Sequence, residues 1–125
     1  MKAIKLLDNF IEIPMIDKDG KVKHTLRFDY TDEAIKELNK NNDLIKARVK
    51  EMEKNTNEDN IADEDKEIVR MGLDSTFGEG TFDELYKINP TTFVLAVYFM
   101  QTALIIKEEV EKIQTESLVD KYIDG

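Results

Sequence analysis

The stretch Met71-Gly72-Leu73-Asp74-Ser75-Thr76-Phe77-Gly78-Glu79-Gly80-Thr81-Phe82-Asp83-Glu84-Leu85-Tyr86 decides how the chain folds, because it places glycines among large apolar side chains. Gly78 and Gly80 accept positive φ angles without steric cost, which suits the end of a helix and the turn after it. Thr81 with Glu84 matches a capping box, in which hydroxyl and carboxylate each bond a free backbone N–H. The stretch therefore predicts a helix, a turn and a second helix. Its large apolar side chains form either a core corner or a partner groove, and they are Phe77, Phe82, Leu85 and Tyr86.

Length and composition predict one globular domain covering residues 1–125. A chain of 125 residues buries roughly two thirds of its unfolded surface. Its net charge of −9 repels phosphate backbones and anionic lipid, so we expect neither nucleic acid nor a membrane as partner. The absence of cysteine excludes disulfides, thiol catalysis and thiolate metal sites. The first residues contain no apolar run long enough for a secretory signal, so we expect a cytoplasmic protein.

Two runs between residues 10 and 30 carry apolar residues at every second position, which is the period of a strand. The turn between them reads Asp17-Lys18-Asp19-Gly20, and such residues tolerate the positive φ angles of hairpin turns. Pro14 places the first strand at a sheet edge. The residues predicted to share one side are Ile11, Ile13 and Met15 on the first strand, and Val22, His24, Leu26, Phe28 and Tyr30 on the second.

The period changes to that of a helix at Thr31, which we expect to be the N-cap and which is followed by two acids. We expect one helix to about Lys54. Asn42 fills one place in its apolar stripe, where it either sets the register between helices or marks a break in an asparagine-rich segment. The other members of the stripe are Ile35, Leu38, Ile45, Val49 and Met52.

The remaining chain predicts a polar linker near residues 55–65 and three further helical segments. The first begins near Asp63 and ends at the glycines, and the second begins at Thr81. Asn89 as N-cap and Pro90 as first helical residue predict the start of the last helix, since proline's missing N–H is not needed there. That helix extends to about Tyr122. The fold class is therefore mainly α: an N-terminal β-hairpin followed by a four- or five-helix domain with a long C-terminal helix.

The first half of the last helix, residues 93–106, is apolar on almost every side and needs cover from several directions. Its 14 residues fall short of the ~20 that cross a bilayer. It is therefore either a buried core helix, an oligomer interface or a partner groove. The candidate apolar interface is Phe93, Val97, Met100 and Leu104.

No catalytic, cofactor or metal site is predicted, so we expect a protein that is not an enzyme. His24, the single histidine, lies on an apolar strand face without an evident partner for general-base work. The acids between Glu58 and Glu67 lack a glycine to bend them around a cation. The Gly78-Glu79-Gly80 turn lacks the Lys and Ser or Thr of a phosphate loop.

Several of these segments together resemble a known family. They are Arg27-Phe28-Asp29, the Gly78-Glu79-Gly80-Thr81-Phe82 corner, Tyr86 after it, and Asn89-Pro90-Thr91 before a long helix. From about Val22 to Ile113 the chain resembles the small tail assembly chaperones of long-tailed phages and prophages of Gram-positive bacteria.

The resemblance implies a non-enzymatic helper of virion assembly. Such proteins bind the long hydrophobic tape measure protein, keep it soluble, and help to recruit tail tube subunits. It also implies a homo-oligomer in the host cytoplasm that is absent from the finished particle. The alternative is a helical interaction or regulatory module unrelated to tails, dimeric through the stripe from Ile35 to Met52.

Overall fold

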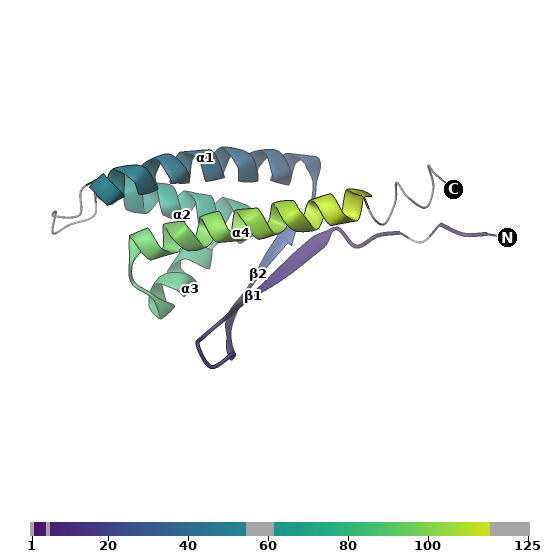
Figure 1. Ribbon diagram of the computed structural model, residues 1–125, viewed down its shortest axis with the longest axis horizontal. Coiled ribbons are helices and arrows are strands. Elements are labelled where there is room, and N and C mark those ends of the chain that lie inside the picture. The colour runs from purple at the N-terminus through teal and green to yellow at the C-terminus, as the bar shows by residue number, and fades with distance from the viewer. Residues whose placement is uncertain (1, 5, 55–61, 116–125) are drawn as a thin grey trace.

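The computed structural model describes residues 2–4, 6–54 and 62–115. Within them, a two-stranded antiparallel sheet is followed by four helices, which confirms the predicted mainly helical fold with an N-terminal hairpin (Figure 1). The elements are β1 (Phe10–Ile16), β2 (Val22–Asp29), α1 (Asp32–Lys54), α2 (Asp63–Phe77), α3 (Thr81–Ile88) and α4 (Thr92–Lys112).

The hairpin forms as its alternating pattern predicts. Asp17 closes the turn, because its carboxylate accepts the N–H groups of Asp19 and Lys21 at 2.8 and 3.0 Å. Gly20 has the positive φ of 84° that this turn requires. Pro14 lies opposite Thr25. Since the sheet has two strands among the described residues, β1 is an edge strand, as the proline predicts.

Helix α1 is continuous from Asp32 to Lys54, so the asparagine-rich segment does not break it. The Thr31 hydroxyl accepts the N–H of Ala34 at 3.0 Å and is the predicted N-cap. Asn42 lies buried within the apolar stripe of α1, and its Oδ1 has no hydrogen-bond partner among the described residues. The apolar stripe packs within the chain, so a dimer along that stripe would have to remove it from the core. Its fully buried members are Leu38, Ile45, Val49 and Met52.

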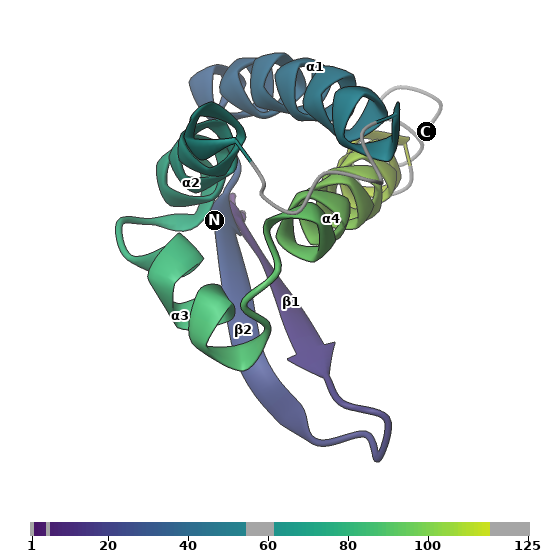
Figure 2. The same ribbon diagram turned by 90° about the vertical axis from the view of Figure 1, so that its left-hand side faces the viewer.

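Helices α1, α2 and α4 lie alongside one another, and the hairpin crosses beneath α2 and α4 (Figures 1 and 2). Short α3 lies below α2 and α4, at the left-hand end of the helices in Figure 1. One cluster of buried apolar side chains joins the inward face of the hairpin to the helices. Gly72 of α2 leaves room for the Ile45 side chain of α1, since a Cβ at position 72 would lie 2.6 Å from Ile45 Cδ1. The hairpin and all four helices therefore share a core.

The prediction for the start of α4 is wrong. Asn89 ends α3, where its N–H bonds to the carbonyl of Leu85 at 2.8 Å, and so does not cap the next helix. Pro90 lies in the connection. Helix α4 begins at Thr92 after Thr91, which makes no side-chain cap within the described chain. The helix continues to Lys112, and its predicted extension to Tyr122 lies largely outside the described residues.

The predicted capping box in the corner is also wrong. Gly80, with φ of 92°, is the N-cap of α3, and Thr81 is already helical. The Thr81 hydroxyl donates to the Gly78 carbonyl at 2.6 Å. The free N–H of Phe82 is accepted by Asp74 of α2 at 2.9 Å. A side chain from the preceding helix therefore replaces the missing local cap.

Candidate interaction surface on helix α4

The predicted corner side chains belong mainly to the core. Phe82 and Leu85 expose 0% and 2% of their surface, while Phe77 and Tyr86 are half-buried. The Phe82 and Tyr86 rings stack with centroids 5.3 Å apart, and Phe77 meets Phe99 of α4 edge-on at 6.1 Å. The Phe77–Phe99 contact joins α2 to α4, whereas the Phe82–Tyr86 stack lies within α3. The corner is a joint between helices.

Two cations from α2 cover the aromatic side chains of α3. The Arg70 guanidinium lies 4.4 Å from the centre of the Phe82 ring, and Lys66 lies 4.5 Å from that of Tyr86. Arg70 also bonds Asp83 at 2.6 Å. This hydrogen bond, opposed in part by burial, raises the pKa of Arg70 above its ordinary value. The guanidinium is charged at neutral pH in any case and makes a cation–π contact with the ring. The corner therefore offers little open apolar surface.

The outward face of α4 has the opposite character. Of the predicted interface residues, Phe93, Val97 and Met100 are half-buried, and Leu104 exposes 59% of its surface. The opposite side of the helix is fully buried and includes Leu95, Ala96, Phe99, Ala103 and Ile106. Helix α4 is thus covered on one side and open on the other.

Three of the predicted interface residues line a shallow hollow between α1 and α4, which we call the α1–α4 groove. Its volume is about 310 Å³. Lys46 and Lys107 place two cations beside it, and Gln101 and Asn42 add amide groups. The apolar lining is Val97, Met100 and Leu104; Phe93 lies outside the groove. An apolar hollow beside two lysines suits a side chain from another apolar segment with acidic neighbours.

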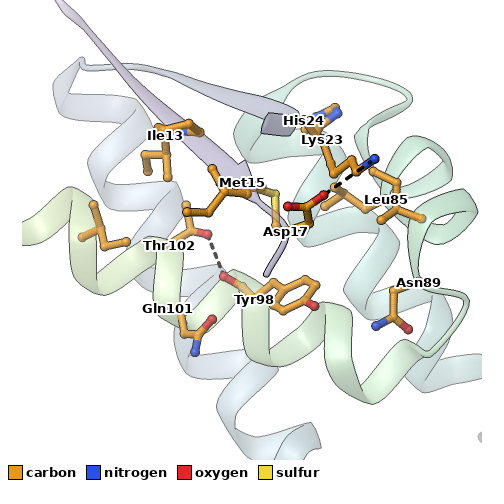
Figure 3. Close-up of a pocket in the computed structure, with 14 residues that line it drawn as sticks. Ile13, Met15, Asp17, Lys23, His24, Leu85, Asn89, Tyr98, Gln101 and Thr102 are labelled. Atoms are coloured by element: carbon orange, nitrogen blue, oxygen red, sulfur yellow. Dashed lines mark hydrogen bonds and ion pairs between the residues drawn. The ribbon is translucent and has the colours of Figure 1, made fainter. Parts of the chain in front are cut away.

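Two adjoining hollows run along the other side of α4, beside β1, and we call them together the hairpin groove. They measure about 400 and 460 Å³ and share Ile13, Pro14 and Ile105. Figure 3 shows the first hollow, with Met15 at the end of the hairpin facing Tyr98 of α4. Its exposed apolar residues are Ile16, Ile88 and Ile105, which come from three different elements.

Polar groups in the hairpin groove do not form a catalytic arrangement. Asp17 pairs with Lys23 at 3.8 Å, and the Thr102 hydroxyl donates to the Tyr98 carbonyl at 2.6 Å (Figure 3). Among the described residues, the imidazole of His24 makes no hydrogen bond that would orient it as a base. The groove is better suited to apolar contact than to proton transfer.

The acid-rich segment after α1 lies partly outside the described residues. In its described part, Arg48 binds Glu64 at 2.8 Å and Asp65 at 3.4 Å, so these carboxylates pair with a cation of α1. No group of three or more potential metal-ligating side chains is found in residues 2–4, 6–54 and 62–115.

Within the described part of the chain, no single helix has the length and apolar character needed to cross a bilayer. Helix α3 and the segment Thr92–Thr115 meet that test only when joined, and they are bent by 119° at the break.

The sequence did not predict that Ile16, Ile88 and Ile105 lie together on the surface of the hairpin groove. Ile105 belongs to the run that was expected to need cover, but its spacing alone does not tell which side of α4 the hairpin occupies. Ile88 ends α3, and Ile16 precedes the hairpin turn. Only the packing of the hairpin against α3 and α4 brings the three together.

Comparisons with protein-family models, curated proteins and solved structures gave no match. The resemblance to tail assembly chaperones therefore rests on the corner and the flanking segments quoted above.

Proposed function

We propose that this chain is a non-enzymatic tail assembly chaperone, which binds and solubilises a phage tape measure protein and helps to recruit tail tube subunits. In this role it acts as a homo-oligomer in the host cytoplasm. The proposal combines the family resemblance of the corner with one structural observation. That observation is the open apolar face of α4.

The face has the spacing that a helical partner requires. Val97, Met100 and Leu104 follow one another at intervals of three and four residues, so they form a ridge along one side of α4. An apolar stripe on another helix packs against such a ridge through the neighbouring groove. A tape measure protein is long and largely helical by the resemblance, and it would offer many such stripes.

The expected strength of each contact agrees with a temporary function. Covering one large aliphatic side chain contributes about 1.5–3 kcal/mol before the entropic cost of binding. Leu104 and its half-buried neighbours therefore give a weak single contact that many copies along one partner would multiply. The acidic surface keeps such a coated complex soluble, since the chain carries a net charge of −9.

The proposal predicts a tape measure gene next to the gene of this chain, and co-expression of the two proteins tests it. We expect the soluble fraction of the tape measure protein to rise several-fold with the wild-type chain. The combined change Val97→Asp and Leu104→Asp should abolish that rise, because charge on the ridge opposes apolar packing. Met71→Asp, at another half-exposed apolar residue on α2, is the matched control and should behave as wild type. Equal insolubility with and without the chain would refute the chaperone function.

A further inference from the structure

The residues before β1 form an exposed apolar arm. Ile4 and Leu6 expose 91% and 87% of their surface, and Leu7 is exposed as well. Three large aliphatic side chains within four residues are a large apolar surface to leave in water without a use. We call residues 2–9 the N-terminal arm; residue 5 of the arm is not described.

The arm is fixed where it joins the fold. The Asn9 carbonyl accepts the N–H of Tyr30 at 2.7 Å, and the Asn9 side chain donates to the Tyr30 carbonyl at 3.2 Å. Beyond this point the arm leads away from the hairpin and the helices (Figure 1). To enter the hairpin groove of its own chain, the arm would have to reverse beside Asn9 and run back along β1. The anchoring bonds to Tyr30 oppose that reversal.

The hairpin groove has surface chemistry that complements the arm. Its rim exposes Ile16, Ile88 and Ile105, which are aliphatic like the arm's own side chains. Glu12 and Glu109 line its second hollow. The arm sequence in turn carries Lys2 and Lys5. Apolar surface and opposite charge therefore match between two parts of one chain that the fold keeps apart.

Backbone pairing contributes little to this recognition. The free edge of β1 includes Pro14, which has no N–H to offer a further strand. Side chains entering the groove must therefore supply most of the binding.

We propose that the N-terminal arm of one copy binds the hairpin groove of a second copy. The contact joins two different surfaces, so it forms either a reciprocal pair with two exchanged arms or an open chain of copies. It specifies a contact for the homo-oligomer of the proposed function, but it uses neither Leu104 nor the α1–α4 groove, so its failure would leave the tape measure binding test unaffected.

Sedimentation velocity over a range of concentrations tests this proposal. The wild-type chain should form species heavier than the 14.5 kDa monomer as concentration rises. Leu6→Asp with Leu7→Asp should raise the dissociation constant at least about tenfold, because two aliphatic contacts are lost. Ile88→Lys with Ile105→Lys should do the same from the groove side. Met71→Lys is the control and should leave the association unchanged.

A mixing experiment distinguishes a second copy from other occupants of the groove. The arm variant keeps an intact groove, and the groove variant keeps an intact arm. An equimolar mixture should therefore form a 1:1 complex, although each variant alone stays monomeric with unchanged circular dichroism. A wild-type chain that stays monomeric at all concentrations would overturn the proposal and indicate self-docking or a foreign partner. Undiminished association of the arm variant would overturn it as well.

Discussion

In the α2–α3 corner, Phe82 and Leu85 expose 0% and 2% of their surface, whereas Leu104 on α4 exposes 59%, although both segments are rich in large apolar residues. The corner is covered because its glycines let α3 turn back against α2, while Asp74 holds the new helix in place. Helix α4 makes no such turn, and the elements packed against it leave the face that carries Leu104 open. Apolar sequence therefore becomes core where the chain folds back on it and becomes surface where neighbours are absent.

The largest loss of stability should come from removing a buried aromatic ring in the corner. Phe82→Ala should lower the free energy of unfolding by about 3–5 kcal/mol, because it leaves a cavity and removes the stacking on Tyr86. Chemical denaturation monitored by circular dichroism measures this loss. Tyr86→Phe keeps the stacked ring and should have a much smaller effect. A loss below about 1 kcal/mol for Phe82→Ala would mean that the corner is not core.

A smaller loss of stability should follow from adding a side chain at Gly78, in the turn between α2 and α3. Gly78 has φ of 115° and ψ of 147°, a conformation that is essentially restricted to glycine. Gly78→Ala should cost about 1–3 kcal/mol in the same assay. A Cβ there would meet no atom within 4 Å, so the cost comes from the backbone and not from a clash. Glu79→Ala, at the exposed neighbour, is the control; an equal loss in both variants would contradict this explanation.

A still smaller loss of stability should follow from removing the Asp74 side chain of α2, which caps α3. Asp74→Ala leaves the N–H of Phe82 without its acceptor, and lost N-caps typically cost about 0.5–2 kcal/mol. Asp74→Asn keeps an acceptor oxygen and should retain most of the stability. If the alanine and asparagine variants lose the same amount, the hydrogen bond does not stabilise the corner.

The smallest effect on stability is expected on the open face of α4. Leu104→Ser should change the free energy of unfolding by no more than about 0.5 kcal/mol, as for other exposed positions. A loss as large as that of Phe82→Ala would show that Leu104 is core and would remove the contrast between the two regions.

Local sequence signals predict most of this fold. The alternating runs and the Asp-Gly turn predict the hairpin, and the Thr31 cap with its apolar stripe predicts α1. The boundaries at both ends of α3 are less accessible to such reasoning. Its cap comes from Asp74, eight residues earlier, and Asn89 ends α3 instead of beginning α4. These outcomes depend on how α2, α3 and α4 meet, which local patterns do not contain.

The candidate surface on α4 was likewise predictable only in part from the sequence. The spacing of Val97, Met100 and Leu104 predicts that they share one face of a helix. It does not predict whether that face lies inside or outside, because the answer depends on where α1 and the hairpin settle. The hairpin groove depends on packing even more, since its exposed residues come from β1, α3 and α4.

Protection of a single thiol on α4 tests most directly whether this face binds a partner. The chain has no cysteine, so Leu104→Cys and Met71→Cys each introduce a unique, similarly exposed thiol. The rate of alkylation is measured for each variant alone and in a soluble complex with the tape measure protein. The account predicts that the complex slows alkylation at position 104 at least about tenfold and leaves position 71 unchanged, because only the first lies beneath the partner. Equal rates at position 104 with and without the partner would contradict it.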